Sequence, residues 1–360
     1  MHTHLLVFPL IVFTAASATA GDVPQGDSKL SDIVTYPAAS SPWRVGVGYA
    51  QLLGLKTSFS GLGKFNSPFS AQPTGGGVSY DYDNGFVHVD SSGNTGSQTW
   101  NWAYQNSSQY QPAGSGTMNF SITNSNANGS VDERGDAESG IELFAYYDMG
   151  AIGFSPLKEC KATWGFRGGI HYSYIGVDNG GFLTTNLTTT TDSFDLNGVI
   201  SPLAPYSGSF GGPGPLLGDN PLRGISGGSG SVTGNRELDV HLTITNFGTY
   251  FEVPVTNEFD MMIEAGVSLG IASGSYDYTS TTSVNGLGSQ QSSGSDSRTR
   301  LLPGVYVGLS GTYEITKQWS IQGAGRYQYM DSYNMEANGS HASLSFESAF
   351  VVSVGCIYSF

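Results

Sequence analysis

Apolar and polar side chains alternate along several stretches of the chain. In WRVGVGYAQL, Val45, Val47 and Tyr49 fall on one face of a strand, and Arg44 falls on the other. A period of two residues is typical of β-strands whose two faces meet different surroundings. Eight such stretches can be counted, at about 43–52, 141–154, 160–177, 237–253, 259–278, 301–315, 319–330 and 345–360.

The connections between these stretches come in two kinds. SPLKE, PVTNE and TKQ are short, whereas two other connections run over about 57–138 and 178–235. Transmembrane β-barrels typically have short turns at one end, long loops at the other and strands of about 10 residues. A closed barrel also has no sheet edge to leave unpaired in hydrocarbon. We therefore expect an all-β fold: an eight-stranded antiparallel transmembrane β-barrel over 43–360, with short periplasmic turns and long extracellular loops.

The final strand, SFESAFVVSVGCIYSF, places apolar or aromatic residues at alternate positions and ends on an aromatic ring. This ending, with the hairpins FEVPVTNEFDMMIEAG and GTYEITKQWSIQGAGRYQY, resembles outer-membrane proteins of Gram-negative bacteria. The strand count resembles the small barrels typified by the OmpA membrane domain and OmpX. The resemblance covers roughly 43–360 in pattern, although the first two loops are much longer than usual.

The resemblance implies a place in the bacterial outer membrane, with the lipid bilayer around a monomeric barrel. It also implies that the last strand is the assembly signal that the barrel-assembly machinery recognises. The positions that would carry this signal are Phe350, Val352, Val354, Tyr358 and Phe360.

The N-terminus indicates export. LLVFPLIVF followed by Ala18-Thr19-Ala20 is typical of a signal peptide over 1–20 that directs a chain to the Sec pathway. A periplasmic segment over 21–42 would follow it. No other apolar run approaches the roughly 18 residues that a spanning helix requires.

Charge and cysteine content exclude other classes. The formal net charge is -15, which argues against a nucleic-acid partner, because phosphate binding needs clustered Lys and Arg. The two cysteines, Cys160 and Cys356, fall on strands predicted to lie too far apart for a disulfide. We expect two separate thiols that face lipid.

Polar side chains opposite the apolar face are expected to fill the inside of the barrel, because eight strands leave room only for side chains. Charges of both signs occur there, so paired carboxylates and guanidiniums are expected. A polar plug and a gated conduit, in which the pairs exchange partners, both fit this pattern. The predicted network consists of Arg44, Arg167, His171, Glu252, Asp260, Glu264, Arg326 and Glu347.

The stretch 237–253 is irregular, because Leu238 to Ile244 and Phe251 have opposite parity. A β-bulge near Asn246–Gly248 would reconcile them. Asp239 and His241 would then share an exposed face beyond the membrane. Two ligands are too few for a zinc site, so a polar strand face is favoured over a metal pair or proton relay.

Catalytic groups are sparse. His88 with Asp90, and His341 with Ser340, are the candidate pairs, but no motif of a known hydrolase surrounds either histidine. Acidic turns such as YDYDNG lack the spacing of an EF-hand. We expect no enzyme activity, no cofactor and no metal.

The first long loop contains a group of aromatic residues among Asn, Gln and Ser. Such a composition is typical of adaptable surfaces that bind sugars or proteins. A loop of this length must also bury something to stay ordered, so the rings could instead form its own small core. The residues are Trp100, Trp102, Tyr104 and Tyr110.

A structural or surface-interaction role in the outer membrane, with a surface glycan or a protein as possible ligand, fits these patterns best. A narrow porin-like channel is the first alternative. The second is a secreted soluble β-protein that binds glycans.

Overall fold

The computed structural model describes residues 41–69, 71–74, 77–90, 96–135, 137–153 and 161–360. The predicted signal peptide, nearly all of the segment 21–42 and Cys160 lie outside these residues. The described part consists of strands and one 3-10 helix, η1 (Ser107–Gln109), which confirms the all-β prediction. Within these ranges, no helix has the length and apolar character needed to cross a membrane.

The strands differ greatly in length. They are β1 (Trp43–Leu53), β2 (Lys56–Phe65), β3 (Ala71–Thr74), β4 (Gly77–Tyr82), β5 (Gly85–Val87), β6 (Gln98–Thr99), β7 (Trp102–Tyr104), β8 (Tyr110–Gln111), β9 (Thr117–Arg134), β10 (Glu138–Ala151), β11 (Thr163–Asn179), β12 (Leu183–Asp195), β13 (Tyr206–Ser207), β14 (Leu217–Gly218), β15 (Leu222–Pro254), β16 (Phe259–Val284), β17 (Gly288–Glu314), β18 (Trp319–Ala337) and β19 (Ser340–Ser359).

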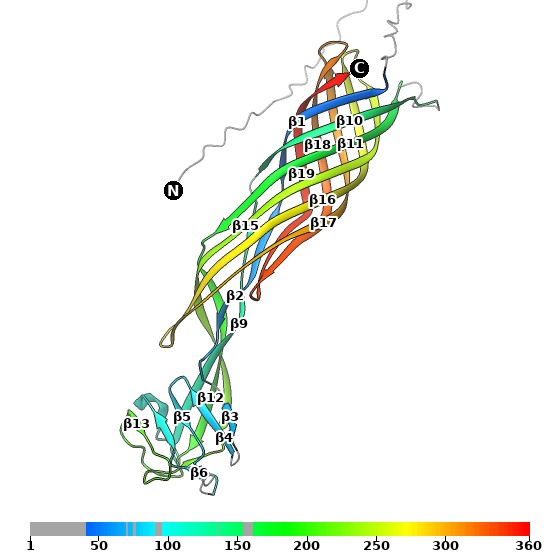
Figure 1. Ribbon diagram of the computed structural model, residues 1–360. Coiled ribbons are helices and arrows are strands. Elements are labelled where there is room, and N and C mark those ends of the chain that lie inside the picture. The colour runs from blue at the N-terminus through cyan, green and yellow to red at the C-terminus, as the bar shows by residue number, and fades with distance from the viewer. Residues whose placement is uncertain (1–40, 70, 75–76, 91–95, 136, 154–160) are drawn as a thin grey trace, which may run out of the picture. The chain divides into compact units, whose positions relative to one another are not determined.

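Eight strands of the described part form a ring of antiparallel ladders (Figure 1). β1 pairs with β10 on one side and with β19 on the other. From β10 the ladders continue through β11, β15, β16, β17 and β18 back to β19. Arg44 on β1 therefore lies opposite both Tyr146 and Ser359. Every pairing is antiparallel, as predicted.

The main sheet contains more than the eight strands predicted, and the two predicted long loops contain strands. Twelve strands share the main sheet: the eight of the ring, β8, which pairs with β9, and β2, β9 and β12, which lie almost entirely within 57–138 and 178–235. They connect β19 to β15 where β1, β10 and β11 have ended. Their sequences, such as LTTNLTTTTDSFD in β12, have the polarity of loops. Thr nevertheless favours strands, because its branched side chain packs well on a pleated surface.

The polarity of the side chains inside the ring changes along its length. On β15, we call residues 245–254 and their neighbours the proximal half, and residues 222–244 and their neighbours the distal half. The distal half is filled mainly by apolar side chains, among them Leu242, Ile244 and Met330, although Arg236 and Ser340 are also buried there. The inside of the proximal half holds charged and polar groups instead.

β15 runs from the distal half into the proximal half without a bulge. Its ladders to β11 and β16 have no register shift, so the bulge predicted near Asn246–Gly248 is wrong. Even-numbered residues face inward from Gly230 to Glu252: Ile244 and Tyr250 are fully buried, whereas Phe247 is exposed. The parity of the apolar positions changes in the sequence because apolar residues lie on the inner face up to Ile244 and on the outer face from Phe247, in one regular strand.

Two small sheets lie between β2 and β9 and between β12 and β15 in sequence. β3, β4, β5, β7 and β13 form one, and β6 and β14 form the other. We call the described residues of 66–116 and 196–221 the loop domain. Its core is a cluster of mostly aromatic side chains that includes Tyr82, Trp102 and Tyr104, together with Phe120 of β9 and Phe194 of β12.

Candidate functional site

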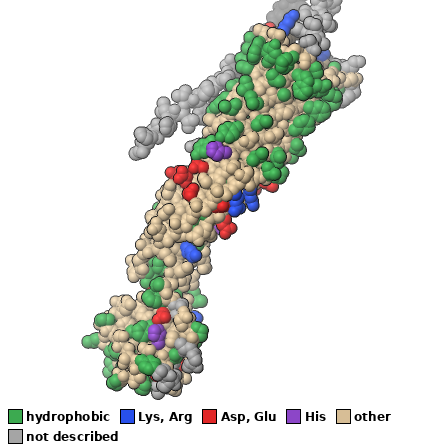
Figure 2. Space-filling model, in the orientation of Figure 1, with side chains coloured by type: hydrophobic (Ala, Val, Ile, Leu, Met, Phe, Trp, Pro, Cys, Tyr) green, Lys and Arg blue, Asp and Glu red, His purple; other side chains and the backbone are tan. Residues whose placement is uncertain are grey.

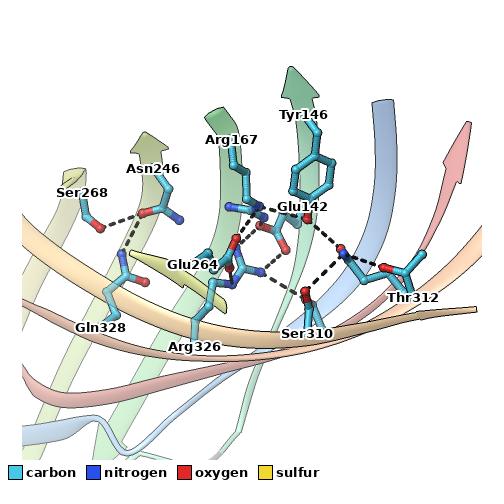
Figure 3. A network of polar contacts seen from close by, with 12 residues as sticks. Glu142, Tyr146, Arg167, Asn246, Glu264, Ser268, Ser310, Thr312, Arg326 and Gln328 are labelled. Atoms are coloured by element: carbon cyan, nitrogen blue, oxygen red, sulfur yellow. Dashed lines mark hydrogen bonds and ion pairs between the residues drawn. The ribbon is translucent and has the colours of Figure 1, made fainter. Parts of the chain in front are cut away.

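Four charged side chains meet at the centre of the proximal half (Figure 3). Arg167 Nη2 of β11 donates to Glu142 Oε1 of β10 over 2.5 Å, and Arg167 Nε lies 3.1 Å from Glu264 Oε2 of β16. Arg326 of β18 donates through both terminal nitrogens to Glu142. Its Nε lies 3.6 Å from Glu264 Oε1. The side chains are at most 2% exposed, so two positive and two negative charges balance in a site that excludes most water.

A glycine makes room for this group. Gly308 of β17 pairs with Glu264 on one side and with Arg326 on the other. A Cβ atom at residue 308 would lie 2.5 Å from Arg326 Cγ and 2.8 Å from Glu264 Oε1. The two charged side chains can converge because no side chain separates them.

Neutral polar groups surround the four charges (Figure 3). Arg167 Nε donates to the Tyr146 hydroxyl, which in turn donates to Gln322 Oε1 over 3.0 Å. Gln322 Nε2 lies within hydrogen-bond distance of Ser310 and Thr312 on β17. The network thus extends from β10 and β11 across the inside of the ring to β17 and β18.

A separate trio lies beside the network. Ser268 Oγ donates to Asn246 Oδ1 over 2.7 Å, and Gln328 Nε2 donates to the same oxygen over 3.2 Å. These three residues come from β16, β15 and β18 and are buried. Buried polar groups are stabilised when they pair in this way.

A second ionic group lies nearer the chain ends. Arg44 donates to both carboxylate oxygens of Glu252 over 3.0 and 2.7 Å, and to Asp148 over 3.0 Å. The Tyr250 hydroxyl contacts both Arg44 and Asp148. Asp260 is half-buried at an inward position of β16, opposite Pro254 of β15. Charged groups therefore occupy two levels of the proximal half.

Two predicted members of the network behave differently from the rest. His171 is buried beside Glu142, but neither ring nitrogen has a hydrogen-bond partner among the described residues. Glu347 is exposed, which corrects its predicted place inside the ring. Phe346 and Ala349 on either side both face inward, because β19 has an extra residue opposite the register shift at Gln328 and Met330.

Glu142 and Tyr146 were missed from the predicted network. Both lie on the parity opposite Ile141 and Leu143, which are exposed. The alternation within 141–154 contained the signal, since a Glu between two exposed apolar residues must face inward on a strand.

The aromatic residues of the first predicted loop belong mostly to the core of the loop domain. Trp102 and Tyr104 are buried there, so they cannot form a recognition surface. Trp102 Nε1 donates to the Pro215 carbonyl over 2.9 Å, and the Tyr104 hydroxyl donates to the Pro202 carbonyl. Trp100 and Tyr110 are half-buried.

The predicted chemical pairs are arranged as follows. Asp239 and His241 face outward on β15, where Tyr172 lies 2.9 Å from His241 Nδ1 and Tyr174 donates to Asp239. His88 Nε2 lies 2.8 Å from Asp81, a residue other than its predicted partner Asp90. No group of three or more His, Cys, Asp or Glu that could hold a metal ion occurs among the described residues.

An apolar belt covers the outer face of the proximal half (Figure 2) and continues a few residues beyond it on β11, β16 and β17. Large apolar side chains are exposed on every strand of the ring there, and aromatic rings are frequent at both edges. Its residues are Trp43, Val45, Val47, Tyr49, Ile141, Leu143, Ile170, Tyr172, Tyr174, Phe247, Phe251, Met261, Ile263, Val267, Leu269, Ile271, Leu301, Val305, Val307, Leu309, Tyr313, Trp319, Ile321, Tyr327, Tyr329, Phe350, Val352, Val354 and Phe360. Cys356 is also exposed, between Val47 and Ile321 of the neighbouring strands.

No family model matches the chain, and no curated protein matches it. Among solved structures, Ail, the attachment invasion locus protein of Yersinia pestis, aligns with a TM-score of 0.29 and 8% identity over 88% of this chain and 97% of its own. The outer-membrane protease OmpT of Escherichia coli aligns with a TM-score of 0.30 and 9% identity over 91% and 99%. A Pseudomonas aeruginosa FadL homologue gives 0.16 and 10% over 88% and 90%. TM-scores this low assign neither a fold nor a function to the chain.

Proposed function

We propose that the proximal half spans a bacterial outer membrane, reached by Sec export, and that the distal half carries the loop domain on the cell surface in a structural or interaction role. The observation that carries this proposal is the exchange of inner and outer polarity along continuous strands. On β15, Ile244 is buried inside the ring and Phe247 is exposed outside it. A strand in water buries its apolar face, whereas a barrel strand in lipid exposes it.

The dimensions of the apolar belt support a membrane span. Met261 and Ile271 mark its extent on β16. The ten steps between these two residues, at about 3.3 Å each, give about 33 Å along the strand. At the tilt of about 40° that is usual for barrel strands, this corresponds to about 25 Å, the height of the lipid-facing band in outer-membrane barrels.

The aromatic edges of the belt agree with this placement. Trp43 and Trp319 lie at the edge near the chain ends, while Tyr49 and Tyr329 lie at the edge toward the distal half. Aromatic girdles of this kind mark the two interfaces of membrane barrels. The short turns after β15 and β17 then face the periplasm, and the loop domain faces the outside.

The filled interior favours a structural or interaction role over a channel. The four-charge group blocks the proximal half, and the apolar cluster around Leu242, Ile244 and Met330 fills the distal half. An ion would have to break the buried pairs of the proximal half and then pass the apolar side chains packed in the distal half, and both steps are strongly unfavourable. We also propose a non-catalytic role, because the ion-pair partners of His88 and His341 among the described residues are the carboxylates of Asp81 and Glu336. The His88 ring also stacks on Phe86.

Cell fractionation combined with detergent gels tests the proposal. We expect the full chain in the outer-membrane fraction, with unboiled samples that migrate differently from boiled ones. Release into the medium without detergent would instead support the soluble glycan-binding alternative. Protease sites introduced at exposed positions of the loop domain should be cut in whole cells, and protection of these sites in intact cells would contradict the orientation.

A further inference from the structure

A pocket of about 280 Å³ opens in the wall of the distal half. It forms where the β18–β19 hairpin turns back at Asn338 and Gly339 while β2, β9 and β16 line the space beside it. β2 is irregular here: its ladder to β9 shifts register twice around Leu62, and Gly61 and Gly63 have φ angles of 72° and 83°. A Cβ atom at residue 61 would lie 2.3 Å from the Gly339 carbonyl oxygen, so this close approach requires glycine.

The floor of the pocket has an unused hydrogen-bonding group. Ser280 is 1% exposed, and its Oγ has no hydrogen-bond partner. The other hydroxyls are occupied: Tyr278 bonds Ser292 over 2.9 Å, and Ser125 bonds Thr185 over 2.7 Å. Buried hydroxyl groups nearly always have a partner, so an unpaired one in a pocket indicates a missing polar ligand or water.

The mouth of the pocket supplies charge and amide groups. Lys64, Asn126 and Asn338 are exposed there, and no carboxylate is among the lining residues. Lys64 is therefore a local positive charge on a chain whose formal net charge is -15. An ammonium group with three donors attracts an anionic group, while amides and a hydroxyl can bond neutral hydroxyl groups.

We propose that this pocket binds one sugar unit that carries a carboxylate. The volume lies just below the range of about 300 to 1,000 Å³ that is usual for drug-sized ligands, so it suits a single ring. Lys64 pairs with the carboxylate at the mouth, and Ser280 bonds a ring hydroxyl at the floor. The inference goes beyond the proposed function, because none of the pocket residues belongs to the charged network or to the apolar belt.

Titration of the purified full chain in detergent tests the proposal. The probes are the methyl glycosides of glucuronic and galacturonic acid, each compared with the neutral glycoside of glucose or galactose. We expect at least one acidic glycoside to bind about tenfold more tightly than its neutral counterpart, which corresponds to about 1.4 kcal/mol. Lys64→Met should remove this preference, and Ser280→Ala should weaken both members of the pair about tenfold. Ser283→Ala changes an exposed serine on the same strand and should alter neither affinity.

Three results would overturn the proposal. They are an absence of binding by all four glycosides, equal binding of acidic and neutral members, and binding that Lys64→Met and Ser280→Ala leave unchanged. Heat-modifiable migration of each variant shows whether its ring is intact. A folded protein that binds no glycoside contradicts the pocket proposal alone, whereas loss of heat-modifiable migration in the unsubstituted chain contradicts the proposed membrane barrel.

Discussion

Ile244 and Phe247 lie three residues apart on β15 and face opposite sides of the same wall, Ile244 fully buried inside the ring and Phe247 57% exposed outside it. No register shift separates them. Within these three residues, the large apolar side chains of the strand change from the inner face to the outer face. This position marks the boundary between the part of the ring that buries its apolar face and the part that exposes it.

A charge at Phe247 tests that boundary. Phe247 pairs with Val267, close to the midpoint of the apolar belt on β16. In the proposed membrane span, Phe247→Arg should destabilise the barrel by about 2 to 4 kcal/mol, because a lipid-facing Arg near the middle of a bilayer is costly. Ser283→Arg, on the outer face of the distal half, should stay within about 0.5 kcal/mol. Denaturant unfolding in phospholipid vesicles measures both. Equal effects of the two variants would place Phe247 outside the lipid.

The four-charge group predicts a large loss of stability when one of its carboxylates is replaced by a neutral amide. Glu142→Gln leaves Arg167 and Arg326 with an uncompensated charge in a buried site, which should destabilise the fold by about 3 to 5 kcal/mol. Glu336→Gln removes the partner of an exposed His341 pair 3.8 Å apart and should change the stability by at most about 1 kcal/mol. The same unfolding assay compares them. A loss below about 1 kcal/mol for Glu142→Gln would show that water reaches the network.

The filled interior predicts an electrically silent protein. Purified protein in planar bilayers should give no steady unitary currents, because the charged network and the apolar cluster fill successive levels of the ring. A preparation of an open porin serves as the positive control for insertion. Steady currents from this chain would favour the channel alternative.

We expect changes at Phe360 to reduce assembly more than the loss of its few packing contacts would explain. Its backbone N–H donates to the Trp43 carbonyl at the closing ladder, and its ring contacts Tyr358 with centroids 5.1 Å apart, while 51% of the residue remains exposed. Deletion of Phe360 or Phe360→Asp should strongly reduce the amount in the outer membrane. Ser359→Ala should leave it unchanged. Quantitative blots of fractionated cells measure the amount of each variant in the outer membrane. Normal levels of the Phe360 variants would exclude an assembly role.

The loop domain should open at high pH. Burial, with a hydrogen bond from the Tyr82 hydroxyl to Asp192 Oδ2, raises the pKa of Tyr82 above its usual value of about 10. The folded state therefore keeps a proton that the unfolded state loses above about pH 10, and stability falls as the pH rises from there. Trp102 fluorescence should report this change. Tyr82→Phe should make the fall shallower, and an identical pH profile for both proteins would contradict the role of Tyr82.

Alternation was informative wherever a strand has one apolar face. It predicted that the all-β chain contains antiparallel hairpins, and it identified β1 and β19 in nearly their observed positions. It failed for β12, where two of the four buried residues, Thr185 and Asp192, are polar and Thr, Ser and Asn fill most of the other positions. Periodicity of hydrophobicity does not detect a strand whose buried positions are half polar.

The contacts within the candidate site could not be predicted from the sequence for a different reason. Arg326 meets Glu142 across 184 residues of chain, and their contact depends on the register of three ladders on one side of the ring and of five on the other. Parity shows that both side chains face inward, but it does not show at which level of the ring each one lies. Glu347 illustrates the limit, because one extra residue on β19 sends it to the outer face.

The unbroken length of β15, from Leu222 to Pro254, has a mechanical consequence. A pull on Leu222 runs along the strand, while the hydrogen bonds to its neighbours lie across it. Such a load shears many bonds together, whereas a pull across the ladder would break them one after another. Traction on the loop domain would therefore reach the apolar belt along one continuous strand, and the ladders of β15 would resist it collectively.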